Sequence, residues 1–101
     1  MKEGKITLDV DYYCIQCGHR KSISYCPIAI ALDHVKEFDF KEIGVSPSEI
    51  LGWTDKEIVS FKVPQEAKDF IKHFDNGNPV DPMVLTLEIL SVKDLNEETR
   101  L

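Results

Sequence analysis

Alternating apolar and polar residues mark several short strands along this 101-residue chain. Near the N-terminus the apolar positions are Ile6, Leu8 and Val10. This period of two predicts a strand with one buried face. Residues 49–63 contain two further alternating runs around the turn sequence TDK, and they predict a hairpin. The run MVLTLEIL at 83–90 is almost continuously apolar, which is typical of a strand with both faces partly covered.

Two segments instead show helical spacing. CPIAIALDHVKEF, residues 26–38, has Pro27 at a favourable first position and Lys36 near the expected C-terminal end. PQEAKDFIKHFDNG, residues 64–77, begins with a proline and ends in a turn sequence. The apolar stripes of the two segments are Ile28, Ala31, Leu32, Val35 and Phe38, and Ala67, Phe70, Ile71 and Phe74. Stripes at this spacing predict one buried face on each helix.

Two shorter stretches are also informative. Asp11 is a suitable N-cap for a short helical turn over 12–17, and Gly18 is a suitable stop in the left-handed region. Ile43 and Val45 alternate as in a strand, and the SPSE sequence that follows fits a capping box. SPSE is compatible either with one helical turn or with a bend in an edge strand.

The order of predicted elements is strand, helix, strand, strand, helix, strand. Two helices packed on one face of a four-stranded, mostly antiparallel sheet would bury the apolar stripes. We therefore predict an α+β protein with the βαββαβ order of ferredoxin-like folds. Residues 1–90 form the expected single domain, and residues 91–101 form a polar C-terminal tail.

The charge distribution narrows the class of partner. The net charge is −6: residues 1–26 carry four Lys/Arg against three Asp/Glu, and residues 27–101 carry eight against fifteen. Nucleic-acid-binding proteins usually present a basic face, so an acidic surface favours a protein partner instead. The chain has no long apolar segment and three cysteines, which leads us to expect a cytoplasmic protein with reduced thiols and no membrane contact.

The segment CIQCGHRKSISYC contains all three cysteines and one histidine. A zinc site would use Cys14, Cys17, His19 and Cys26, because His34 lies eight residues beyond Cys26, or ~12 Å along a helix. The preferred alternative is that the cysteines pack as small apolar residues, so no cofactor is expected.

Cys26 has a second interpretation, because it directly precedes Pro27 at a helix N-terminus. That position stabilises a thiolate, but no base or oxyanion cradle is recognisable in the sequence. A core or capping role for Cys26 is therefore preferred to a nucleophilic one, and we predict that the protein is not an enzyme.

Four residues are the candidates for binding. The Arg20 guanidinium suits a carboxylate or a phosphate, with Lys21 beside it. Tyr25 is an aromatic neighbour that suits stacking on a base, and Trp53 at a hairpin end suits a protein interface. The structural alternatives are an ion pair for Arg20 and coverage of the core edge for Trp53.

The motifs taken together resemble a family of small uncharacterised proteins found in bacteriophages, prophages and some bacteria. The resemblance covers roughly residues 5–90. It rests on Ile15, Gly18 and Arg20, on CPIAIAL, on PQEAKDFIKHFDNGNPVDP and on MVLTLEIL. Cys14 and Cys17 fall at positions that the family pattern leaves free, so the resemblance does not imply a zinc site.

The resemblance implies a small accessory protein that works in the cytoplasm of a bacterial host cell. We expect a non-enzymatic protein that binds a host or phage protein through its acidic surface, in counter-defence or in modulation of a host enzyme. The alternative is a small zinc- or anion-binding module that contacts nucleic acid through residues 12–25. The identity of the partner and the oligomeric state are left open.

Overall fold

The computed structural model describes residues 4–95, which form three helices and five strands. The strands are β1 (Lys5–Val10), β2 (Glu42–Val45), β3 (Ile50–Trp53), β4 (Glu57–Phe61) and β5 (Met83–Asp94). The helices are α1 (Tyr12–Cys17), α2 (Pro27–Asp33) and α3 (Gln65–Asp75). The sheet order is β1-β5-β4-β3-β2, and every neighbouring pair is antiparallel. The α+β class is confirmed.

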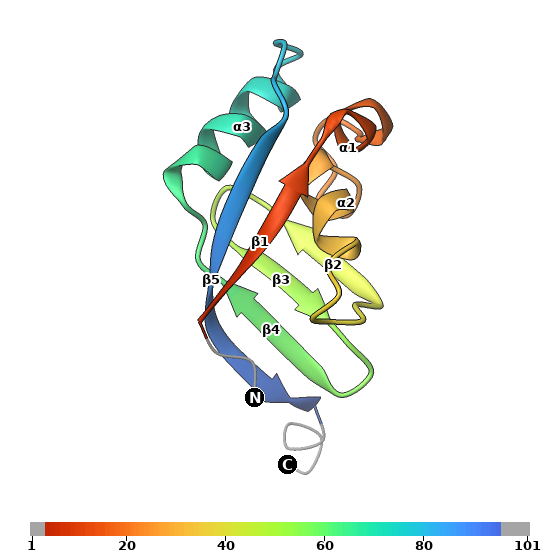
Figure 1. Ribbon diagram of the computed structural model, residues 1–101, viewed down its shortest axis with the longest axis vertical. Helices are drawn as coiled ribbons and strands as arrows, with labels where there is room; N and C mark the ends of the chain where they lie inside the picture. Colours follow the sequence, from red (N-terminus) through yellow and green to blue (C-terminus); the bar gives the residue numbers. More distant parts are fainter. Residues whose placement is uncertain (1–3, 96–101) are drawn as a thin grey trace.

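The long strand β5 connects the two parts of the sheet. Its first half, Met83–Glu88, pairs with β1, and its second half, Ile89–Asp94, pairs with β4. Figure 1 shows β5 running along most of the molecule, with β1 beside its upper half and the β2–β3–β4 meander beside its lower half. The register shifts where β4 ends, between Ser60 and Phe61. A shift of this kind bends a strand and increases its twist.

The helix α2 lies against both β1 and β2, which are the two outer strands of the sheet order. The sheet therefore curls around α2 (Figure 1). All three helices contribute side chains to one apolar cluster enclosed by the sheet. This arrangement brings the outer edge of β2 close to α2.

Only one face of the sheet is buried. Leu8 and Leu85 are paired across β1 and β5 and are both buried, whereas Val84 and Leu90 are 70% and 61% exposed. The prediction that both faces of 83–90 are partly covered is therefore wrong. The helices cover the inner face, and the alternate residues of β5 point to solvent.

The prediction of four strands in ferredoxin-like order is also wrong. Glu42–Val45 forms a fifth strand, β2, and β1 lies at one end of the sheet beside β5. SPSE is a tight turn between β2 and β3: the Ser46 Oγ accepts hydrogen bonds from the N–H groups of Ser48 and Glu49, at 3.3 and 3.2 Å. Ser46 is therefore a capping residue, as the sequence predicts, but the structure that it caps is a hairpin turn and not a helix.

The helix α2 ends at Asp33, five residues before the predicted end, so Lys36 lies beyond it. Phe38 and Phe40 are both buried, and their rings stack with centroids 5.0 Å apart. Residues two positions apart share one side only in extended backbone. The chain leaves the helix before Phe38 because both rings pack against Phe61.

The predicted second helix is confirmed as α3, with Ala67, Phe70 and Ile71 buried. Its end is a Schellman motif, in which the Gly77 N–H bonds the Phe74 carbonyl and the Asn78 N–H bonds the His73 carbonyl. Gly77 has φ +81°, which favours glycine.

The structure describes the first part of the predicted C-terminal tail, residues 91–95. β5 continues to Asp94, so residues 91–94 belong to the sheet, and residues 96–101 lie outside the described part of the chain. No helix within residues 4–95 is long and apolar enough to cross a membrane.

Candidate functional site

A groove of about 730 Å³ separates α2 from the outer edge of β2. Ile30 and Asp33 line it from α2, and Glu42 and Ile43 line it from β2. The loop before α2 and the end of β3 complete its walls. The groove exists because α2 packs across the curled sheet while no strand within residues 4–95 pairs with the outer edge of β2.

Two aromatic side chains that were predicted as binding residues both line this groove. Tyr25 is 64% exposed, and Trp53 is half-buried on the outer face of β3. A Cβ placed on Gly44 would lie 3.7 Å from the Trp53 ring, so the glycine of β2 leaves the indole room to lie across that strand. The topology thus brings together two candidate binding residues that are 28 positions apart in the chain.

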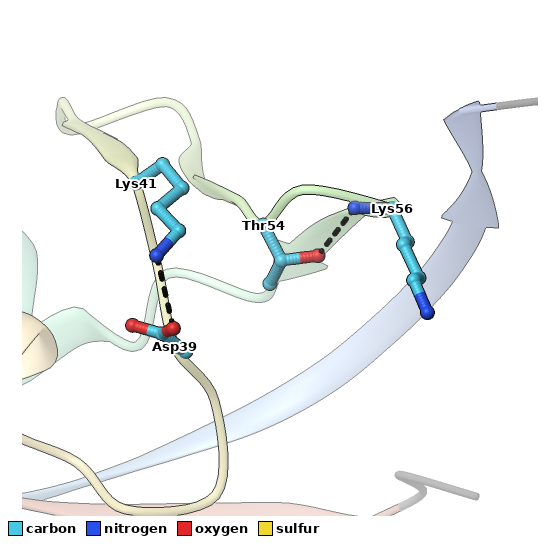
Figure 2. A network of polar contacts seen from close by, with 4 residues as sticks. All are labelled: Asp39, Lys41, Thr54 and Lys56. Atoms are coloured by element: carbon cyan, nitrogen blue, oxygen red, sulfur yellow. Dashed lines mark hydrogen bonds and ion pairs between the residues drawn. The ribbon is translucent and has the colours of Figure 1, made fainter.

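Carboxylates dominate the charge of the groove. Asp33, Glu42 and Asp55 line it with one cation, Lys41. The Lys41 ammonium lies 3.0 Å from an Asp39 oxygen, and this hydrogen bond raises the pKa of Lys41 (Figure 2). Because Asp39 compensates the cation, the groove presents an excess of negative charge to a partner.

The negative surface continues around the β3–β4 turn. A second hollow of about 390 Å³ shares Thr54 and Asp55 with the groove and adds Asp39, Glu57 and Asp94, with Lys56 as the cation in its lining. The Thr54 Oγ1 accepts the Lys56 N–H at 3.1 Å and the Glu57 N–H at 2.9 Å, which fixes the shape of this turn. Figure 2 shows the Lys56 side chain directed away from Asp39 and Lys41.

The β2 backbone also contributes to the groove. The Ser46 N–H bonds the Glu49 carbonyl in the register that pairs Gly44 with Leu51. In an antiparallel ladder, hydrogen-bonded and non-hydrogen-bonded pairs alternate, so the peptide groups of Ile43 and Val45 face away from β3. The Val45 N–H donates to the Ile23 carbonyl at 2.7 Å, whereas Ile43 lies further along the edge and lines the groove.

The other two candidate binding residues, Arg20 and Lys21, lie beside the end of α3 and do not line the groove. The Lys21 N–H donates to the Asp75 carboxylate at 2.8 Å, and Lys21 has φ +59°. The Arg20 guanidinium packs over Gly77, where an added Cβ would lie 3.2 Å from its central carbon. These contacts connect the loop to α3.

The three cysteines have different environments. Cys14 is buried, and desolvation raises the pKa of its thiol to about 11. Cys26 is the buried N-cap of α2, and its sulfur accepts the Ala29 N–H at 3.5 Å. Burial raises the pKa of the Cys26 thiol and outweighs the opposing backbone hydrogen bonds, so the expected thiolate stabilisation is not the net effect. Cys17 is exposed.

The candidate zinc ligands do not converge. Among residues 4–95, no three His, Cys, Asp or Glu side chains lie where they could hold one metal ion. Gly18 is the C-cap of α1, as predicted, but its φ is −73°, so the predicted left-handed conformation is wrong. A Cβ on Gly18 would instead lie 2.6 Å from the Pro27 ring, which explains why a glycine fits at this position.

Sequence reasoning missed Asp33, Glu42 and Asp55 as functional residues, because acidic residues are scattered along the chain. They meet only through the packing of α2 against β2 and through the β3–β4 turn. A recognisable indication was the position of Asp33 after the buried stripe of α2. Comparisons with known protein families, curated proteins and solved structures found no match for this chain.

Proposed function

We propose that this protein is a small non-enzymatic module of phage type that binds a basic host or phage protein through the α2–β2 groove. The observation that carries the proposal is that Tyr25 and Trp53 line one groove together with three carboxylates. Tyrosine and tryptophan are enriched at protein interfaces, where each buries a large area at low cost in side-chain entropy.

The charge of the groove indicates the chemistry of the partner. Glu42 and Asp55 are exposed, and the chain as a whole carries −6. Negative potential over a binding face steers positively charged partners and disfavours negatively charged ones. A lysine or arginine of the partner would find both carboxylates and the face of an aromatic ring in the groove.

The burial and the raised pKa of two of the thiols support a binding function over a catalytic one. A nucleophilic cysteine needs a lowered pKa and access to its substrate. Cys14 and Cys26 are both buried, and burial raises the pKa of each. The buried set within residues 4–95 contains no polar or charged side chain.

The resemblance to phage and prophage proteins supports the biological setting. The motifs around Gly18, Arg20 and Cys26 carry this resemblance, and in the structure they connect the N-terminal loop to α2 and α3. A small acidic protein of this kind would act in the bacterial cytoplasm, in counter-defence or by modulating a host enzyme. The groove is then the surface that contacts the target.

The test compares two variants with the same change in charge. Glu42→Lys/Asp55→Lys reverses the groove, and Glu66→Lys/Asp81→Lys reverses exposed positions on α3 and in the loop before β5. Proteins captured from a bacterial lysate are quantified for wild type and both variants. We expect a partner that is lost at least tenfold with the groove variant and retained with the control. Equal retention by both variants would refute the groove as the binding site.

One observation favours a second candidate, contact with nucleic acid through residues 12–25. Tyr12, Tyr13 and Tyr25 are each at least 60% exposed, and Arg20 and Lys21 belong to the same segment. Fluorescence polarisation with a labelled single-stranded oligonucleotide separates the two functions. Binding that Tyr13→Ala weakens and that Glu42→Lys/Asp55→Lys does not weaken would favour this candidate, since Tyr13 lies outside the groove.

A further inference from the structure

We propose that the partner binds by strand addition: an extended segment with alternating basic and apolar residues pairs with the free edge of β2. This inference rests on the proposed function, because it specifies how the same groove receives a protein. Strand addition supplies affinity through main-chain hydrogen bonds and specificity through alternate side chains.

The hydrogen-bond pattern between β2 and β3 shows which peptide groups of β2 lie on its free edge. Ile43 directs its N–H and C=O away from β3, toward the side of the groove. Two residues further on, the Val45 N–H already bonds the Ile23 carbonyl. The turn at Ile23 thus shows that an N–H on this edge can donate to a backbone carbonyl outside the sheet, and this contact lies two residues from Ile43.

Side chains alternate between the two faces of a sheet, and this alternation determines which residue types the added strand should carry. Residues directly opposite one another in a ladder project to the same face. The residue opposite Ile43 would therefore point inward, toward Ala29 and Ile30 of α2, and should be apolar. Its two neighbours would point outward, to the face that carries Glu42 and Trp53, and should be lysine or arginine.

Charge also selects a partner over a second copy of this chain. Pairing two β2 edges would bring Glu42 of one copy close to the same carboxylates of the other, in a protein with a net charge of −6. Like charges brought together in this way are destabilising. A basic segment instead compensates the charge of Glu42 and of the neighbouring Asp55 when it binds.

The probe is a labelled peptide of sequence Gly-Lys-Val-Lys-Val-Lys-Gly, and its binding to the full chain is followed by fluorescence polarisation. We expect Glu42→Lys/Asp55→Lys to weaken binding at least tenfold and Glu66→Lys/Asp81→Lys to change it less than twofold. A matched peptide with glutamate in place of lysine should not bind. Equal binding of the two peptides would overturn the inference.

Amide hydrogen exchange, measured by NMR, reports on the backbone pairing itself. With saturating peptide, exchange of the Ile43 amide should slow at least tenfold, while that of the Val45 amide should change little. Peptide binding without protection at Ile43 would overturn strand addition and leave the groove as a binding site. Failure of the peptide to bind would also overturn strand addition, and the lysate experiment then decides the proposed function separately. Protection of Ile43 that depends on protein concentration without peptide would assign the edge to a second copy.

Discussion

The Val45 amide nitrogen lies 2.7 Å from the Ile23 carbonyl oxygen, so the loop before α2 covers one position on the edge of β2. Ile43, two residues earlier, faces the same edge beside the groove. We predict that the Val45 amide exchanges with solvent at least tenfold more slowly than the Ile43 amide in the free protein. Residue-resolved hydrogen exchange tests this difference. Equal protection of the two amides would show that the edge is already fully paired.

A matched pair of glycines tests the packing under the groove. A Cβ on Gly52 would lie 2.4 Å from the buried Phe40 ring, whereas a Cβ on Gly44 would make an ordinary contact at 3.7 Å with Trp53. We expect Gly52→Ala to lower the free energy of unfolding by roughly 1–3 kcal/mol, as overpacking does. Gly44→Ala should cost less than about 1 kcal/mol. Urea unfolding of both variants checks this, and equal losses would contradict the described position of Phe40.

Thiol labelling separates cysteine packing from metal binding. Cys17 is exposed, whereas Cys14 and Cys26 are buried. We expect native protein to incorporate one maleimide rapidly, at Cys17, and to incorporate all three only after unfolding. Addition of a chelator should not change this pattern. Protein that labels only after chelation, together with about one zinc per chain by elemental analysis, would establish the zinc site instead.

The N-cap of α1 gives a pH-dependent prediction. The Asp11 carboxylate accepts the Cys14 N–H at 3.0 Å, and this hydrogen bond lowers the pKa of Asp11. Because the pKa is lower in the folded protein, the stabilisation is present above about pH 4 and is lost as the pH falls through the lowered pKa. Asp11→Ala should lower the melting temperature by roughly 5 °C at pH 7 and by progressively less in acid. A pH-independent difference would exclude the cap as its cause.

Local features of the chain were predictable where neighbouring residues decide the structure. The stripe of α3 and its glycine stop are local patterns, and the structure contains both. The Asp11 cap depends on a residue three positions away and was also foreseen. In contrast, the end of α2 depends on Phe38 and Phe40 packing against Phe61, which follows Phe40 by 21 residues. The hydrophobic periodicity of residues 26–38 cannot indicate that contact, because Phe61 lies outside this segment.

The turns on the two sides of β3 share a sequence pattern that indicates the additional strand β2. SPSE and TDKE both begin with a hydroxyl residue whose oxygen accepts the N–H groups two and three positions later. Both turns close tight hairpins of the β2–β3–β4 meander. Recognising the shared turn would have predicted three consecutive strands. The sheet order and its curl could not be predicted, because they depend on β5 pairing with both β1 and β4.

The candidate site was predictable in its aromatic residues and not in its charges. Tyr25 and Trp53 were selected from the sequence and both line the groove, whereas Arg20 and Lys21 contact the end of α3 instead. The acidic lining arises from three separate elements, so no local spacing identifies it. Its position follows from α2 spanning the two outer strands of the sheet.

Site-specific photocrosslinking shows whether the partner binds in the α2–β2 groove. A photoreactive phenylalanine analogue replaces either Tyr25, in the groove and 64% exposed, or Val84, on the outer face of β5 and 70% exposed. We expect a crosslink to the captured partner from position 25 and none from position 84. A crosslink from position 84 alone would show that the partner binds the open face of the sheet, and it would contradict the groove as the binding site.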